Sequence, residues 1–141
     1  MTRVWMLPVS VLLCGGLIAT GEVVAGSPGE AVLFLVLFVS LAFVTSPLVF
    51  PRSVGAAEAG RRAALDGAPV VYWRPGCAYC LRLRFRLGVR GRRAHWVNIW
   101  RDAEGAAAVR EATGGDETVP TVVVAGRAHV NPDPAWVRAR L

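Results

Sequence analysis

Two cysteines lie three residues apart in the run WRPGCAYC, at Cys77 and Cys80. Such a pair serves in zinc sites, in structural disulfides and in redox-active dithiols. Zinc needs about four ligands, whereas the chain has only 2 His and one further cysteine, Cys14. Cys14 lies in an apolar run, where a thiol packs as a small hydrophobic group. A zinc site is therefore disfavoured.

A redox-active dithiol fits this spacing best. A disulfide that closes so short a loop constrains the unfolded chain little, and a Cys-x-x-Cys motif beside a strand–helix–strand pattern is typical of thioredoxin-like redox sites. Cys77 precedes a predicted helix, whose unpaired N–H groups and positive dipole end stabilise a thiolate. This placement lowers the pKa of a cysteine below ~8.5. We expect Cys77 to be the nucleophile, Arg74 to add positive charge, and the more buried Cys80 to be the resolving thiol.

The elements that must position this motif form one small α/β domain. Short β-branched and aromatic runs bounded by turn residues predict strands, and a capping Asp before an apolar helical pattern, or a Pro in a first turn, predicts a helix start. We expect strands at residues 69–73, 95–100, 120–125 and 127–130, and helices at residues 78–87, 102–113 and 133–141.

The run LRLRFRL after Cys80 is ambiguous, because its strict alternation is typical of a strand. Leu and Arg are good helix formers, however. The run also joins two strands that look buried, and a parallel pair needs a crossover, which is usually helical. We therefore predict a helix over residues 78–87 and a mixed four-stranded sheet.

The first fifty residues carry almost no charge. Two apolar runs, at about residues 4–21 and 31–50, approach the ~20 residues that a membrane-spanning helix needs. The first run has a rival interpretation as a cleavable signal peptide, because Arg3 precedes an apolar stretch. We place the membrane anchor in residues 1–50, a juxtamembrane linker in residues 51–67 and the redox domain in residues 68–141.

The distribution of arginine predicts the topology. Arg3 precedes the first run, Arg52 and Arg61 follow the second, and the loop between the runs holds only acidic charges. The positive-inside rule then places both chain ends in the cytoplasm, so the redox domain is expected to face the cytoplasm from the cell membrane. The linker is either a short helix near anionic headgroups or a solvated tether.

The basic charge does not indicate a nucleic-acid partner. The formal net charge is +6, all 16 basic residues are Arg, and Lys is absent. No nucleic-acid-binding motif accompanies them. The arginine run over residues 82–93 is typical of a solvated face, although it would also attract acidic partners or lipid.

Three runs together resemble mycoredoxin, the glutaredoxin-like enzyme of actinobacteria. They are VVYWRPGCAYCLRLR, GGDETVPTVVV and VNPDPAWVRARL, and they cover the soluble part of the chain and none of its membrane part. The VNP run stands where ordinary glutaredoxins carry a Gly-Gly pair for the glutathione carboxylate, which disfavours glutathione as the partner. Two departures from mycoredoxins are Gly76, where they usually carry Trp, and the membrane segment.

The resemblance implies a thioredoxin-like (glutaredoxin) fold preceded by the two spans. It implies a cis Val119–Pro120 bond that faces the dithiol, with Cys77 as nucleophile and Cys80 as second thiol. It also implies a substrate site. That site consists of Arg74, Tyr79, Thr118, Val119 and Pro120.

The expected function is a membrane-anchored thiol–disulfide oxidoreductase that reduces mixed disulfides between mycothiol and protein thiols. Its partners are mycothiolated or disulfide-containing proteins, and mycothiol is a co-substrate rather than a bound cofactor. Three alternatives stay open: a thioredoxin- or NrdH-like reductase supplied by a flavoprotein, a membrane redox sensor without turnover, and an iron–sulfur site, since no Pro separates the two cysteines.

Overall fold

The computed structural model describes residues 3–141. It divides into two compact units, of which the first ends at Val49 and the second comprises Phe50–Leu141.

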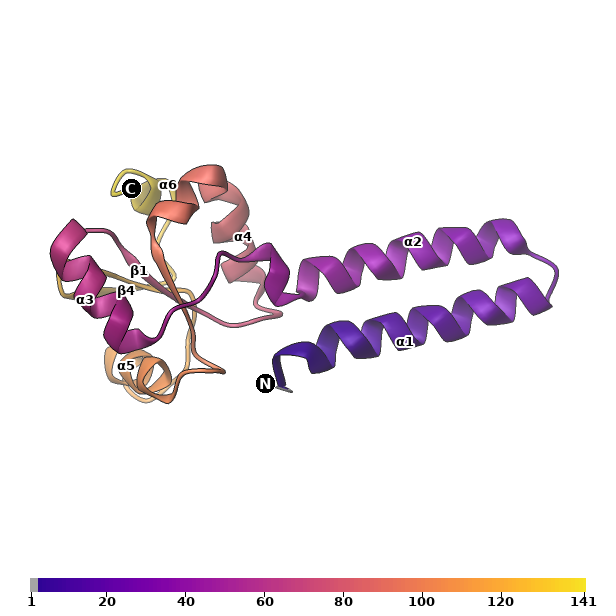
Figure 1. Cartoon of the computed structure of the whole chain (residues 1–141), viewed down its shortest axis with the longest axis horizontal. Helices are drawn as coiled ribbons and strands as arrows, with labels where there is room; N and C mark the ends of the chain where they lie inside the picture. Colours follow the sequence, from indigo (N-terminus) through magenta and orange to yellow (C-terminus); the bar gives the residue numbers. More distant parts are fainter. Residues whose placement is uncertain (1–2) are drawn as a thin grey trace. The chain divides into compact units, whose positions relative to one another are not determined.

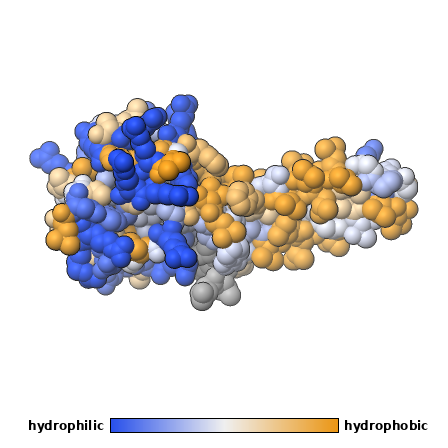
Figure 2. Space-filling model, turned by 45° about the horizontal axis from the view of Figure 1, so that its top comes forward, coloured by the Kyte–Doolittle hydropathy of each residue, from blue (hydrophilic) through white to orange (hydrophobic). Residues whose placement is uncertain are grey.

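The first unit is a pair of helices. Helix α1 (Arg3–Val24) and helix α2 (Pro28–Thr45) lie side by side (Figure 1), and a short 3-10 helix, η1 (Pro47–Val49), follows. Gly15 permits the close approach, since a Cβ at this position would lie 2.4 Å from the Cβ of Phe38. Both helices are long and apolar enough to cross a membrane, a criterion that a signal sequence also meets. Hydrophobic residues cover this unit in Figure 2.

The second predicted span is wrong at both ends. The apolar run at residues 31–50 predicted one continuous span, but α2 begins at Pro28 and ends at Thr45. The N–H of Ser46 still bonds back to the Phe43 carbonyl, after which the backbone becomes extended. Pro51 follows, and the apolar Phe50 belongs to the second unit. Hydropathy alone does not distinguish an apolar residue that faces lipid from one that enters a protein core.

The second unit is built on a mixed sheet, as the sequence predicted. Its strands are β1 (Val70–Trp73), β2 (His95–Asn98), β3 (Thr121–Val124) and β4 (Arg127–Val130), in the order β2-β1-β3-β4. Strand β1 pairs parallel with β2 and antiparallel with β3, and β4 pairs antiparallel with β3.

Helices cover both faces of the sheet. They are α3 (Ala56–Asp66), α4 (Ala78–Leu87), the 3-10 helix η2 (Gly88–Arg93), α5 (Ala103–Thr113) and α6 (Pro134–Arg138). Helix α4 packs against α6, and α3 packs against α5, β1 and β2 (Figure 1). All four residues of β1 are buried, because this central strand is covered on both faces.

Helix α4 resolves the ambiguity of the alternating run. Its buried residues are Cys80, Leu83 and Leu87, which recur at the spacing of one helical face. The helix is the crossover between the parallel strands β1 and β2. Because this one stripe packs inward, the intervening arginines point away from the core, and the alternation of Leu and Arg does not produce a strand.

The linker predicted at residues 51–67 is instead part of the second unit. The ring of Phe50 stacks on Trp73 at 3.7 Å between centroids. The N–H of Val54 donates to the Trp96 carbonyl at 2.9 Å, which extends the sheet beyond β2. Ala59 on α3 is fully buried. The short helix expected within this segment does form, but it covers the sheet instead of serving as a solvated tether.

Candidate active site

The backbone around the dithiol makes Cys77 the first residue before a helix. Strand β1 ends at Trp73, a turn follows, and Cys77 is the N-cap of α4. Its Sγ accepts a hydrogen bond from the Cys80 N–H at 3.2 Å. Gly76, the residue that departs from the mycoredoxin pattern, has φ of +74°. This left-handed conformation is costly for a residue with a Cβ, so the turn itself accounts for Gly in place of the expected Trp.

The environment of Cys77 favours the thiolate. A hydrogen bond from the Cys80 side chain contributes most to a lowered pKa of about 6, against the opposing effect of burial. The N–H groups of Cys80 and Tyr79 and the charge of Arg74 lower the pKa further. A thiol with this pKa is mostly ionised at pH 7, and the thiolate is the form in which a cysteine acts as a nucleophile.

Cys80 has the opposite character. Its side chain is completely buried, and the pKa of its thiol is raised by the hydrogen bond to Cys77 and by burial. The proton therefore stays on Cys80 while Cys77 ionises. The two thiols thus differ in burial and in the direction of their pKa shifts. The roles expected from the motif, with Cys77 as nucleophile and Cys80 as second thiol, stay predictions.

A loop before β3 faces Cys77. The Val119–Pro120 peptide bond is cis, as the resemblance implied. The protonated Cys77 thiol donates to the Val119 carbonyl at 3.3 Å, and both loop residues are buried. A guanidinium nitrogen of Arg74 donates to the Glu117 carbonyl at 3.5 Å. The structure thus brings the dithiol, Arg74 and this loop together.

Tyr79 and Thr118, the remaining predicted site residues, differ in how they lie beside the dithiol and the Val119–Pro120 loop. Tyr79 is 58% exposed and lines a hollow of about 230 Å³ together with Pro120. Thr118 is exposed, and its carbonyl accepts a hydrogen bond from the Thr121 hydroxyl at 2.8 Å. Its side chain is not part of the lining of that hollow.

The structure adds residues to this hollow that the sequence did not single out as site residues. Arg82 of α4 and Asn131, Pro132 and Asp133, which follow β4, complete one side of it. Asn131 adopts a left-handed φ of 47°, and its N–H donates to the Pro120 carbonyl at 2.7 Å. The sequence predicted that the Asp-Pro pair begins a helix. Its position in the lining of this hollow depends on the strand order, which the sequence did not provide.

Comparison with known proteins identifies this domain. Residues 70–130 match the glutaredoxin family model. The chain carries a glutaredoxin-like domain. It therefore has the thioredoxin-like fold, and its general activity is thiol–disulfide oxidoreduction. The matched span runs from β1 to the end of β4 and includes the dithiol and the cis-proline loop. No curated protein matches the chain.

Glutaredoxins act on disulfides of protein substrates, and this geometry suits that chemistry. A thiolate at a helix N-terminus attacks a disulfide sulfur, and the leaving thiol departs as its own thiolate. A hollow lined by Tyr79 and Pro120 lies next to the Cys77 turn and the Val119–Pro120 loop. The second thiol, Cys80, is adjacent but shielded from solvent.

Proposed function

We propose that this glutaredoxin-like protein is anchored in the cell membrane and reduces mixed disulfides between mycothiol and protein thiols. The observation that carries the proposal is the position of Cys77 at the N-cap of α4, with its sulfur 3.3 Å from the Val119 carbonyl oxygen. The preference for mycothiol rests on the residues after β4, where the resemblance to mycoredoxin is most specific.

Those residues offer few backbone donors to a glutathione carboxylate. The Asn131 N–H already bonds to the Pro120 carbonyl, and Pro132 has no N–H to donate. A Gly in place of Pro132 would supply the missing N–H as a donor to a bound anion. This difference supports a thiol cofactor other than glutathione, and mycothiol is the one that the family resemblance favours.

The reaction balances with two molecules of mycothiol. The Cys77 thiolate attacks the mycothiol sulfur of the mixed disulfide, the bond to the protein sulfur breaks, and the protein leaves as a thiolate that takes a proton from water. A second mycothiol thiolate then attacks the sulfur of the mycothiol bound to Cys77. Mycothiol disulfide forms, and the Cys77 thiolate is released. The mixed disulfide gains two electrons as it is split into a protein thiol and a mycothiol thiol, and the two mycothiols lose two electrons as they form mycothiol disulfide.

The test is turnover of a mycothiolated protein by the full-length chain in detergent. Replacement Cys77→Ser should lower kcat/KM by at least about 1,000-fold, because a serine hydroxyl is not ionised at neutral pH. Cys80→Ser should keep activity within about threefold, since its hydroxyl still donates to the Cys77 sulfur. Substantial turnover by Cys77→Ser would refute the mechanism, and faster turnover with glutathione than with mycothiol would refute the thiol preference.

A dithiol route is the second candidate, and the contact between Cys77 and Cys80 favours it. The two thiols share a hydrogen bond, so Cys80 is placed to attack a mixed disulfide on Cys77 and release the bound thiol. A flavoprotein reductase would then reduce the resulting disulfide. In this case Cys80→Ser would abolish turnover, and a thioredoxin reductase would support activity without any low-molecular-weight thiol.

The membrane orientation belongs to the same proposal. Two apolar helices and the position of the arginines support an anchor with both ends in the cytoplasm. A reporter that is active only in the cytoplasm should be active when fused after Leu141 and inactive when inserted in the turn at Gly26. The reverse pattern would place the redox domain outside. A mature membrane-bound chain that has lost the first apolar run and keeps only α2 as a span would favour a signal peptide.

A further inference from the structure

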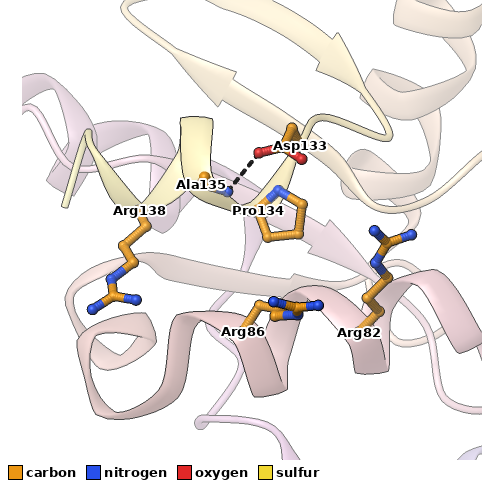
Figure 3. Close-up of a pocket in the computed structure, with 6 residues that line it drawn as sticks. All are labelled: Arg82, Arg86, Asp133, Pro134, Ala135 and Arg138. Atoms are coloured by element: carbon orange, nitrogen blue, oxygen red, sulfur yellow. Dashed lines mark hydrogen bonds between the residues drawn. The ribbon is translucent and has the colours of Figure 1, made fainter.

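A second hollow lies between α4 and α6, and arginines dominate its lining. It has a volume of about 240 Å³. Arg82 and Arg86 project from successive turns of α4, and Arg138 approaches from α6 (Figure 3). Asp133, Pro134 and Ala135 close the remaining side. We call this hollow the arginine groove.

The positive charge of the arginine groove is not neutralised within the described part of the chain. Arg61, Arg62 and Arg110 each form an ion pair with a glutamate, but no carboxylate forms one with an arginine of the groove. The carboxylate of Asp133 instead caps α6, where it accepts the N–H groups of Ala135 at 2.8 Å and Trp136 at 3.3 Å. The arginine groove therefore has three guanidinium groups and one carboxylate in its lining, an excess of two positive charges.

The arginine groove adjoins the hollow that Tyr79 and Pro120 line. Arg82, Asp133 and Pro134 belong to the lining of both hollows. Pro120 directly follows Val119, whose carbonyl oxygen lies 3.3 Å from the Cys77 sulfur. A helix rises 1.5 Å per residue, so the Cα atoms of Arg82 and Arg86 lie about 7 Å and about 13 Å along α4 from that of Cys77. An extended peptide covers these lengths in about two to four residues.

We propose that the arginine groove binds acidic side chains of the protein substrate, located about two to four residues from the cysteine that is being reduced. Guanidinium groups bind carboxylates with paired hydrogen bonds, and a groove on the same helix as the attacking cysteine suits a polypeptide whose disulfide lies at Cys77. This inference rests on the proposed function, because it names the substrate class of the same reaction. It does not depend on which low-molecular-weight thiol is used.

The experiment compares three peptides that each carry one cysteine in a disulfide with mycothiol. The first has two Glu within four residues of the cysteine, the second has the same composition with both Glu about eight residues away, and the third has Gln in place of Glu. With the full-length chain in detergent, kcat/KM should be about tenfold higher for the first peptide than for the other two at low ionic strength. This preference should decline as salt is raised, since the contacts are exposed.

A double variant tests the groove itself. Arg86→Gln with Arg138→Gln should reduce the preference for the near-Glu peptide about fivefold. The matched control, Arg90→Gln with Arg127→Gln, removes the same charge from exposed positions outside the groove and should leave the preference unchanged. Equal losses in both double variants would assign the effect to net charge and overturn the proposal, as would equal rates for the near-Glu and distant-Glu peptides.

Anionic lipid headgroups are the competing occupant of the arginine groove. Assays in nanodiscs of zwitterionic lipid and of anionic lipid distinguish an acidic peptide from a lipid headgroup as the occupant. A preference for the near-Glu peptide in both supports the peptide site, whereas its loss in anionic nanodiscs alone would assign the arginine groove to the membrane surface. Turnover of a small mycothiol disulfide provides the separate check on the proposed function. If Cys77→Ser abolishes that turnover while no peptide preference exists, only the groove assignment fails.

Discussion

The two units of this chain use the same apolar residue types in opposite ways. In the paired helices, Leu17 and Leu33 are 76% and 66% exposed, whereas Val71 and Val97 of the sheet are completely buried. Exposed apolar surface on this scale is unfavourable in water. The helices satisfy their backbone hydrogen bonds internally, as a segment surrounded by lipid must. The second unit instead buries its apolar residues in a core of its own.

The transition from exposed to buried apolar side chains occurs within three residues of the chain. Leu48 in η1 is 66% exposed, and Phe50 is only 7% exposed. The Phe50 ring stacks on Trp73 and meets Trp96 edge-on at 5.7 Å between centroids. The boundary of the second unit is therefore set by an aromatic cluster rather than by the first charged residue.

The largest expected contrast comes from one charge placed in each unit. Val97→Asp buries a carboxylate without a partner, which should cost several kcal/mol and abolish cooperative unfolding of the second unit. Val36→Asp, on the 59% exposed Val36 of α2, should leave that unfolding intact and weaken membrane insertion by about 3 kcal/mol. Thermal unfolding followed by tryptophan fluorescence and membrane fractionation measure the two effects. Equal thermal midpoints for the two variants would contradict the contrast.

A second pair of variants tests the boundary. Phe50→Ala should destabilise the second unit by about 3–4 kcal/mol, because it removes a buried aromatic ring and leaves a cavity. Leu48→Ala, two residues earlier, should change stability by less than about 0.5 kcal/mol. Urea unfolding of both chains gives the comparison. If the two variants unfold at the same midpoint, Phe50 belongs to the anchor after all.

The thiols provide a third contrast. A charged maleimide should label Cys77 with an apparent pKa of about 6, so its rate is nearly constant above pH 7 and falls about tenfold per unit below pH 6. Cys80→Ala should raise this apparent pKa by about one unit, because the Cys80 side chain provides the largest lowering effect. Cys80→Ser, which keeps a donor, should raise it less.

Cys14 of α1 serves as the reference thiol. Hydrocarbon excludes a charged reagent, so Cys14 should stay unlabelled in nanodiscs and react once the chain is unfolded in denaturant. Rapid labelling of Cys14 in nanodiscs would show that α1 is not surrounded by lipid.

The smallest contrast concerns glycine. Gly76→Ala places a Cβ on a residue with φ of +74° and should cost about 1 kcal/mol. Gly16→Ala in α1 has open space around the added Cβ and should not destabilise its helix, since Ala is the better helix former. Denaturant unfolding of the second unit measures the first change, and helical content in micelles the second. A neutral Gly76→Ala would mean that the turn can adopt another conformation.

Much of the second unit was predictable because local rules and tertiary packing agree there. Asp102 accepts the Gly105 N–H as the N-cap of α5, and Gly114 ends that helix in the left-handed conformation; both roles follow from residue type alone. The N-cap position of Cys77 was predictable for the same reason, because the strand before it and the helix after it are each strong patterns.

What could not be predicted depends on contacts between distant residues. An X–Pro bond is cis in only about 5–6% of cases, so only the family resemblance pointed to the Val119–Pro120 geometry. The arginine groove combines Arg86 with Arg138, whose proximity requires the pairing of α4 with α6. Phe50 was predicted to end a membrane span, because hydropathy is judged from neighbouring residues and Trp73, on which Phe50 stacks, is distant in the sequence.

The contacts of Asp102 determine when helix α3 can complete its first turn during synthesis of the chain. While one carboxylate oxygen caps α5, the other accepts the N–H of Ala56 at 2.9 Å and so completes the start of α3. The two ends of this bond are 46 residues apart in the chain. At a synthesis rate of about 5–20 residues per second, the start of α3 waits on the order of 2–9 s for its acceptor. During that interval the segment that follows the two apolar helices has emerged without the fold that later holds it, and it is then most open to chaperones and proteases.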